Sequence, residues 1–146
     1  MKKGLYTLML VPLLTLALAQ DYSYDAVVPD DIPFEPSPVM DGVENAAIVG
    51  DQGEAELYVN VGRLAEGVVF PVHTHTDARL STVLSGTMYY GVGEALEAVE
   101  FVAYPAGSVI YTPPGTPHWM EARDGEVVVQ ESGFGPSETT FLESSE

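Results

Sequence analysis

Short hydrophobic runs separated by turn residues fill most of the chain beyond residue 45. Within several runs apolar and polar residues alternate, which is the pattern of a β-strand with one buried face. Glycine-containing turn signals such as Ser85-Gly86 and Pro105-Ala106-Gly107 lie between them, and no window carries a convincing amphipathic helix. Many short strands at this spacing predict an all-β sandwich or barrel. We expect strands at 46–49, 54–61, 68–73, 78–84, 87–92, 97–104, 108–111, 119–122, 126–131 and 138–141.

The segment before these strands has a different character. Residues 20–44 carry Pro29, Pro33, Pro36 and Pro38 among acidic residues and tyrosines, and no period of 2 or 3.6 survives there. Such a stretch predicts an irregular N-terminal arm. The expected organisation is therefore an arm at 20–44 followed by one β-domain at 45–146.

The first nineteen residues resemble a targeting segment. Lys2 and Lys3 precede an apolar stretch over 5–18, and Ala17-Leu18-Ala19 provides a small-x-small cleavage signal. This arrangement predicts a secretory signal peptide at 1–19 that is cleaved before Gln20. We therefore expect a periplasmic or secreted protein that has no membrane association after cleavage.

The charge and composition exclude several classes of function. The chain has 22 acidic residues against 5 lysines and arginines, which gives a formal net charge of −17. A surface of this sign repels phosphate backbones, so a nucleic-acid partner is not expected. Cysteine is absent, which excludes disulfides, thiolate nucleophiles and cysteine-ligated metals. Both lysines lie in the predicted signal peptide, so Schiff-base chemistry is excluded as well.

The three histidines of the chain form a pattern suited to metal binding. His73 and His75 are two residues apart, so on a strand both imidazoles project from the same face. Two neutral imidazoles on one face are half of a transition-metal site. His118 follows the rigid segment 113–117, Pro-Pro-Gly-Thr-Pro, which would present it at the start of a strand. A neighbouring antiparallel strand would then complete a set of three ligands.

The spacing of these residues resembles the two motifs of the cupin superfamily. Gly67, the pair of histidines and Gly86 match the first motif, and Gly107, Pro113, Gly115 and His118 match the second. The resemblance implies a double-stranded β-helix, or jelly roll, with a metal inside its mouth and a small molecule as substrate or ligand. Members of the superfamily often dimerise, so a homodimer is a further expectation.

Two positions depart from the motifs. Arg79 stands where the family usually has a glutamate ligand, and Ala122 replaces the usual asparagine. Arginine stays protonated and does not coordinate a cation, so the implied ligand set is His73, His75 and His118. Three-His sites resemble those of cysteine dioxygenase-like and diketone-cleaving cupins, which use iron; zinc, copper, nickel and manganese are the other divalent metals considered. Asp77 is a candidate fourth ligand if the strand stays extended beyond His75.

Arg79 has two interpretations. Its guanidinium could bind an anionic group of a substrate beside the metal, or it could pair with an acid such as Asp77 or a carboxylate on the next strand. The leading hypothesis is an exported, metal-dependent, dioxygenase-like enzyme that acts on a small organic molecule, anionic if Arg79 binds it. The alternatives are a non-catalytic cupin that binds a metal or small ligand, and a metal-assisted isomerase, hydrolase or decarboxylase.

Overall fold

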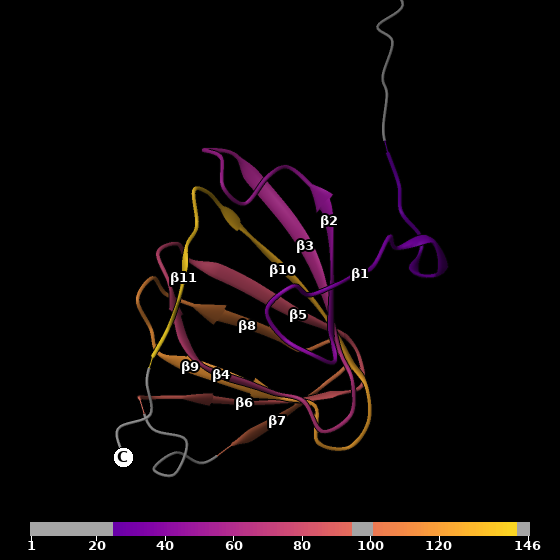
Figure 1. The fold of residues 1–146 in the computed structure, drawn as a ribbon, viewed down its shortest axis with the longest axis vertical. Coiled ribbons are helices and arrows are strands. Elements are labelled where there is room, and N and C mark those ends of the chain that lie inside the picture. Colours follow the sequence, from indigo (N-terminus) through magenta and orange to yellow (C-terminus); the bar gives the residue numbers. More distant parts are fainter. Residues whose placement is uncertain (1–24, 95–100, 143–146) are drawn as a thin grey trace, which may run out of the picture.

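Two antiparallel β-sheets lie face to face in the computed structural model, which describes residues 25–94 and 101–142 (Figure 1). The six-stranded sheet has the order β1-β2-β3-β10-β5-β8, and the five-stranded sheet has the order β11-β4-β9-β6-β7. The expected all-β jelly roll is confirmed. The sheets stay separate and are not hydrogen-bonded into one closed barrel.

The strands follow one another with short connections. Their bounds are β1 (Glu35–Pro36), β2 (Val43–Val49), β3 (Leu57–Leu64), β4 (Val69–His75), β5 (Arg79–Ser85), β6 (Thr87–Val92), β7 (Val102–Pro105), β8 (Val109–Thr112), β9 (His118–Glu121), β10 (Val127–Phe134) and β11 (Thr139–Phe141). A single 3-10 turn, η1 (Pro29–Asp31), precedes them in the described part of the chain.

Apolar side chains from both sheets fill the space between them. On β10, Val127 and Val129 alternate with half-buried neighbours, and on β6 Met88 and Tyr90 do the same. Each such side chain contributes about 1.5–3 kcal/mol when it is fully buried. The buried cluster consists of Val43, Leu64, Val83, Met88, Tyr90, Met120, Ala122, Val127 and Val129. This core fixes the spacing of the two sheets and so the position of the side chains at its edge.

The segment expected to be an arm contributes to the larger sheet. β2 begins at Val43, which is buried in the core, and the two residues of β1 pair with Asn45 and Glu44. A strand of two residues is too short to show any periodicity in a sequence. Residues 25–34 lie to one side of the sheets (Figure 1).

Some sequence predictions fall outside the described residues. These are the signal peptide at 1–19, the first residues of the arm and the first four residues of the strand predicted at 97–104. Across 25–94 and 101–142, no helix has the length and hydrophobicity needed to cross a membrane.

Candidate metal centre

The smaller sheet brings the three histidines together. His73 and His75 are buried on the inward face of β4, and half-buried Thr74 lies between them. His118 is the first residue of β9, where it stands directly opposite His73 in the antiparallel register. Ring centroids are 4.1 Å apart for His73 and His118, 4.7 Å for His73 and His75, and 5.2 Å for His75 and His118.

The turn before β9 fixes the position of His118 relative to β4. Gly115, in the middle of this turn, has φ +71° and donates its N–H to the His75 carbonyl over 2.8 Å. A positive φ of this size is a conformation that glycine adopts without the steric cost of a Cβ atom. Gly115 therefore connects the turn before His118 to β4, the strand of the other two histidines, by a backbone hydrogen bond.

The Nδ1 atoms of all three imidazoles have partners on the side away from the cluster. His73 Nδ1 lies 2.7 Å from the Pro71 carbonyl oxygen, and His118 Nδ1 lies 2.8 Å from the Thr116 carbonyl oxygen. A carbonyl can only accept a hydrogen bond, so both Nδ1 atoms carry a proton and both Nε2 atoms keep a free lone pair. His75 Nδ1 is 3.1 Å from Thr139 Oγ1.

The surroundings keep the imidazoles neutral. Burial, helped by the charge of a neighbouring histidine, lowers the pKa of His73 to about 4. Burial lowers the pKa of His75 further, with the positive charge of Arg79 as the second cause. Burial also lowers the pKa of His118. Neutral imidazole is the form that binds metal ions.

This arrangement fits a metal ion. One nitrogen from each histidine lies within 4.8 Å of the other two, and His75 Nε2 is buried without a hydrogen-bond partner among the described residues. Metal–nitrogen bonds are about 2.0–2.1 Å long, so small rotations of the rings would bring all three nitrogens onto one ion. Backbone and hydroxyl contacts at Nδ1 are the outer interactions that orient ligand histidines in metal sites.

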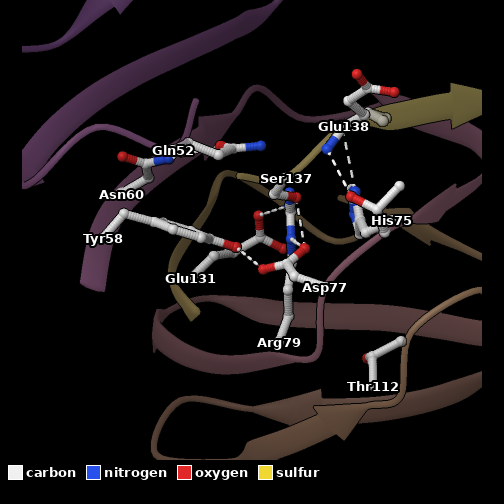
Figure 2. Close-up of polar contacts among 12 residues, drawn as sticks. Gln52, Tyr58, Asn60, His75, Asp77, Arg79, Thr112, Glu131, Ser137 and Glu138 are labelled. Atoms are coloured by element: carbon white, nitrogen blue, oxygen red, sulfur yellow. Dashed lines mark hydrogen bonds and ion pairs between the residues drawn. The ribbon is translucent and has the colours of Figure 1, made fainter. Parts of the chain in front are cut away.

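Asp77 and Arg79 lie beside the histidines in a separate buried polar network (Figure 2). Asp77 accepts hydrogen bonds from the Tyr58 hydroxyl over 2.6 Å and from the Ser137 hydroxyl. Arg79 is 3.5 Å from Asp77 through Nε, and its Nη1 donates to Glu131 over 2.8 Å.

The path of the chain explains where Asp77 lies. The backbone bends at residues 76 and 77, directly after β4 ends at His75. The alternation that would place Asp77 on the histidine face therefore does not continue. Asp77 is not part of the three-His group, and its carboxylate is directed to Tyr58, Arg79 and Ser137.

Arg79 makes the contacts expected from its pairing interpretation. Its side chain is 5% exposed, and Nη2 donates to Ser137 Oγ over 2.9 Å. The carboxylates of Asp77 and Glu131 both pair with this one guanidinium. Anion binding by Arg79 stays a prediction.

Tyr58, Glu131 and Ser137 are members of this network that the sequence reasoning did not single out. Each is far along the chain from its partner, Asp77 or Arg79. Sequence spacing could therefore not predict these contacts. For Glu131 a signal does exist. It continues the alternation of Val127 and Val129, which places a carboxylate on the inward face of a strand.

A cavity of about 460 Å³ opens over His73 and His75. Among its lining residues are His73, His75, Phe70, Met120, Arg79 and Glu131, together with Glu35 and Pro36 of β1. Tyr90 closes one side of the cluster, since its ring stacks on His118 with centroids 5.3 Å apart. The site is large enough for a small organic molecule.

Sequence comparison assigns the central part of the chain to a known family. A family model for the cupin domain matches residues 60–130, which include both histidine motifs, and the fold agrees with solved cupins. The chain belongs to the cupin superfamily. No curated protein matches it in sequence.

Solved structures similar to this cupin share its fold at low sequence identity. An RmlC-like cupin from Ralstonia eutropha superposes with a TM-score of 0.64 at 20% identity, over 83% of this chain and 73% of that one. The DMSP lyase DddQ from Ruegeria pomeroyi gives 0.60 at 16% identity, over 80% of this chain and 59% of that one. The salicylate 1,2-dioxygenase from Pseudoaminobacter salicylatoxidans, in complex with gentisate, gives 0.61 at 15% identity.

The chain spans only part of the two named enzymes. The match takes in 75% of this chain but 32% of the dioxygenase, and 59% of the lyase DddQ. At these identities the likeness concerns the fold.

Proposed function

We propose that this cupin is a metal-dependent enzyme in which the Nε2 atoms of His73, His75 and His118 hold one divalent transition metal, and that it oxidises a small organic molecule with dioxygen. The convergence of three neutral, buried imidazoles on one point beside a cavity carries the proposal. Iron suits this donor set and the reaction, and would supply the activation of dioxygen when bound.

The residues around the site would bind and orient the substrate. Phe70 and Met120 present apolar surface to the cavity, and Glu131 presents a carboxylate. Three protein ligands leave other coordination positions free for small molecules. The similar fold of a salicylate dioxygenase in complex with gentisate supports small-molecule chemistry in such a cavity.

A metal-assisted lyase is the second candidate. The fold of this cupin is also similar to that of the DMSP lyase DddQ, and the inward carboxylate of Glu131 is a group able to accept a proton. The two candidates differ in whether turnover consumes oxygen.

The metal assignment is tested by removing one ligand at a time. His73→Ala, His75→Ala and His118→Ala should each lower iron or zinc content of the purified protein strongly, because two imidazoles alone hold a metal poorly. Thr74→Ala is the matched control, since Thr74 lies between two of the ligands but is directed away from them; it should keep full metal content. Full occupancy in all three histidine variants would contradict the site.

Oxygen uptake then separates the two candidate reactions. Iron-loaded protein should consume oxygen without an added reductant in the presence of a substrate from a panel of small aromatic and enolisable hydroxy compounds. Turnover of panel compounds at the same rate under anaerobic conditions would favour the lyase and contradict the oxidation.

A further inference from the structure

The charges beside the histidines do not balance. Asp77 and Glu131 both pair with Arg79, which is 5% exposed and donates from Nη2 to Ser137 Oγ. Two carboxylates on one guanidinium leave a net negative charge in this network. Each nitrogen of the Arg79 guanidinium donates to one of these protein groups, so an anion in the cavity would meet a guanidinium that two carboxylates already neutralise.

Of the two carboxylates, Glu131 is the one that reaches the cavity. It lies on the inward face of β10, in register with Ser81 of β5, and it lines the cavity together with His73 and His75. Its side chain is 19% exposed, whereas that of Asp77 is 6% exposed. Figure 2 shows Glu131 and Asp77 on the two sides of the Arg79 guanidinium.

The two oxygens of Glu131 have different surroundings. Oε2 accepts a strong hydrogen bond from Arg79 over 2.8 Å, but within 25–94 and 101–142 the only partner of Oε1 is the Ser81 hydroxyl, at 3.4 Å. A neutral hydroxyl at this distance uses little of the capacity of a carboxylate oxygen. Arg79 therefore holds Glu131 in place and leaves Oε1 able to accept a further hydrogen bond.

The carboxylate of Glu131 is close to the histidines without being one of their group. It is not among the side chains whose ligand atoms lie within 4.8 Å of one another. It lines the same cavity as His73 and His75, so a ligand that extends from the histidines into this cavity can meet it.

We propose that Glu131 is the substrate-binding carboxylate of this site and that the substrate meets it with a neutral or cationic hydrogen-bond donor, such as a hydroxyl, amide or ammonium group, rather than with an anion bound by Arg79. This inference rests on the proposed metal site. It assigns Arg79 a positioning role, because the guanidinium acts on the ligand through Glu131.

Two metal-binding probes of nearly the same shape test the proposal. Picolinate carries a carboxylate, and picolinamide carries a neutral amide with N–H donors. Both are titrated into full-length cobalt-loaded protein, and the visible spectrum of the cobalt reports binding. Metal analysis and a thermal melt of each variant precede the titrations.

Glu131→Gln removes the charge and keeps the shape. Picolinate should bind this variant roughly tenfold more tightly, because the repulsion from one nearby charge is gone. Picolinamide should bind a few-fold more weakly, because a charged acceptor has become a neutral one. Cobalt content should stay at the wild-type level. Glu44→Gln is the matched control: Glu44 also accepts from an arginine over 2.9 Å but does not line this cavity.

Several outcomes would overturn the inference. Unchanged affinities for both probes in Glu131→Gln would remove Glu131 from the ligand site while leaving the metal site intact. Weaker picolinate binding in Arg79→Lys, with no gain in Glu131→Gln, would assign anion binding to Arg79 instead. If Glu131→Gln fails to fold, Glu131→Asp takes its place, since it keeps the charge but shortens the side chain. This variant must bind picolinamide more weakly than wild-type protein does and must bind picolinate no more tightly. Wild-type protein that takes up no cobalt would end both this inference and the proposed function.

Discussion

At the scale of single residues, the contacts on the outer side of each imidazole decide how well the site can work. Backbone carbonyls hold His73 and His118. His75 has a backbone contact with Glu138 as well, but its Nδ1 also faces the hydroxyl of Thr139 on β11. A hydroxyl can be removed by mutation without changing the backbone, which makes this contact accessible to experiment.

Thr139→Val keeps the shape of the side chain and removes this contact. The ring of His75 then keeps only its backbone contact with Glu138, so metal affinity should fall by roughly tenfold, the lower end of the effect of losing such an outer contact. Competition with a chromogenic chelator measures the change. Thr140→Val, at the next residue on the same exposed strand, should leave the affinity as it is. Equal affinities in the two variants would show that the Thr139 hydroxyl does not orient His75.

At the scale of elements, β10 joins the core to the polar network. Its inward face runs from Val127 and Val129 through Glu131 to Gly133. A Cβ atom on Gly133 would lie 2.4 Å from Asp77 Oδ2 and 2.5 Å from the Tyr58 hydroxyl. The absence of a side chain at this position makes room for the Tyr58–Asp77 hydrogen bond.

Gly133→Ala should therefore destabilise the protein by about 1–3 kcal/mol, the usual cost of overpacking. Urea unfolding measures this free energy. Gly62→Ala is the control within the same sheet, because its added Cβ would make only ordinary contacts at 3.7 Å; it should change stability little. An unchanged free energy of unfolding in Gly133→Ala would show that Asp77 and Tyr58 can move apart without cost to stability.

Local pattern predicts the strands better than it predicts the polar network. The strand expected at 87–92 is β6 as observed, because its alternation and its flanking turns agree. The three histidines come together as their spacing indicated, since β4 and β9 are neighbours. The partners of Asp77 depended on a bend after His75 and on two distant residues, Tyr58 of β3 and Ser137 between β10 and β11, which no local pattern connects to it. The strand β1 was missed because two residues are too few to show an alternation.

At the scale of the whole molecule, three buried neutral histidines make stability depend on pH. In the unfolded chain each histidine takes up a proton near pH 6.5. In the folded protein burial lowers the pKa of His73 to about 4 and also lowers the other two. Between these values the unfolded state binds more protons, so the folded state loses stability as the pH falls.

Metal-free protein should lose up to about 1.4 kcal/mol of unfolding free energy per histidine for each pH unit below 6.5. Urea unfolding in the presence of a chelator, at several values between pH 7.5 and 4.5, measures the slope. The triple variant His73→Gln, His75→Gln, His118→Gln retains the same acidic surface, so the difference between the two curves isolates the histidines. Parallel curves would contradict the lowered pKa values.

The register of His73 opposite His118 also has a kinetic meaning. These ligands lie far apart in the chain, so they meet only after β4 and β9 have paired across a long loop, and pairing of this kind is slow. An ion that needs all three imidazoles has nothing to bind until that step is complete. Interactions formed after the folding transition state slow unfolding and leave the folding rate almost unchanged. Bound metal would thus prolong the lifetime of the native state without speeding its formation.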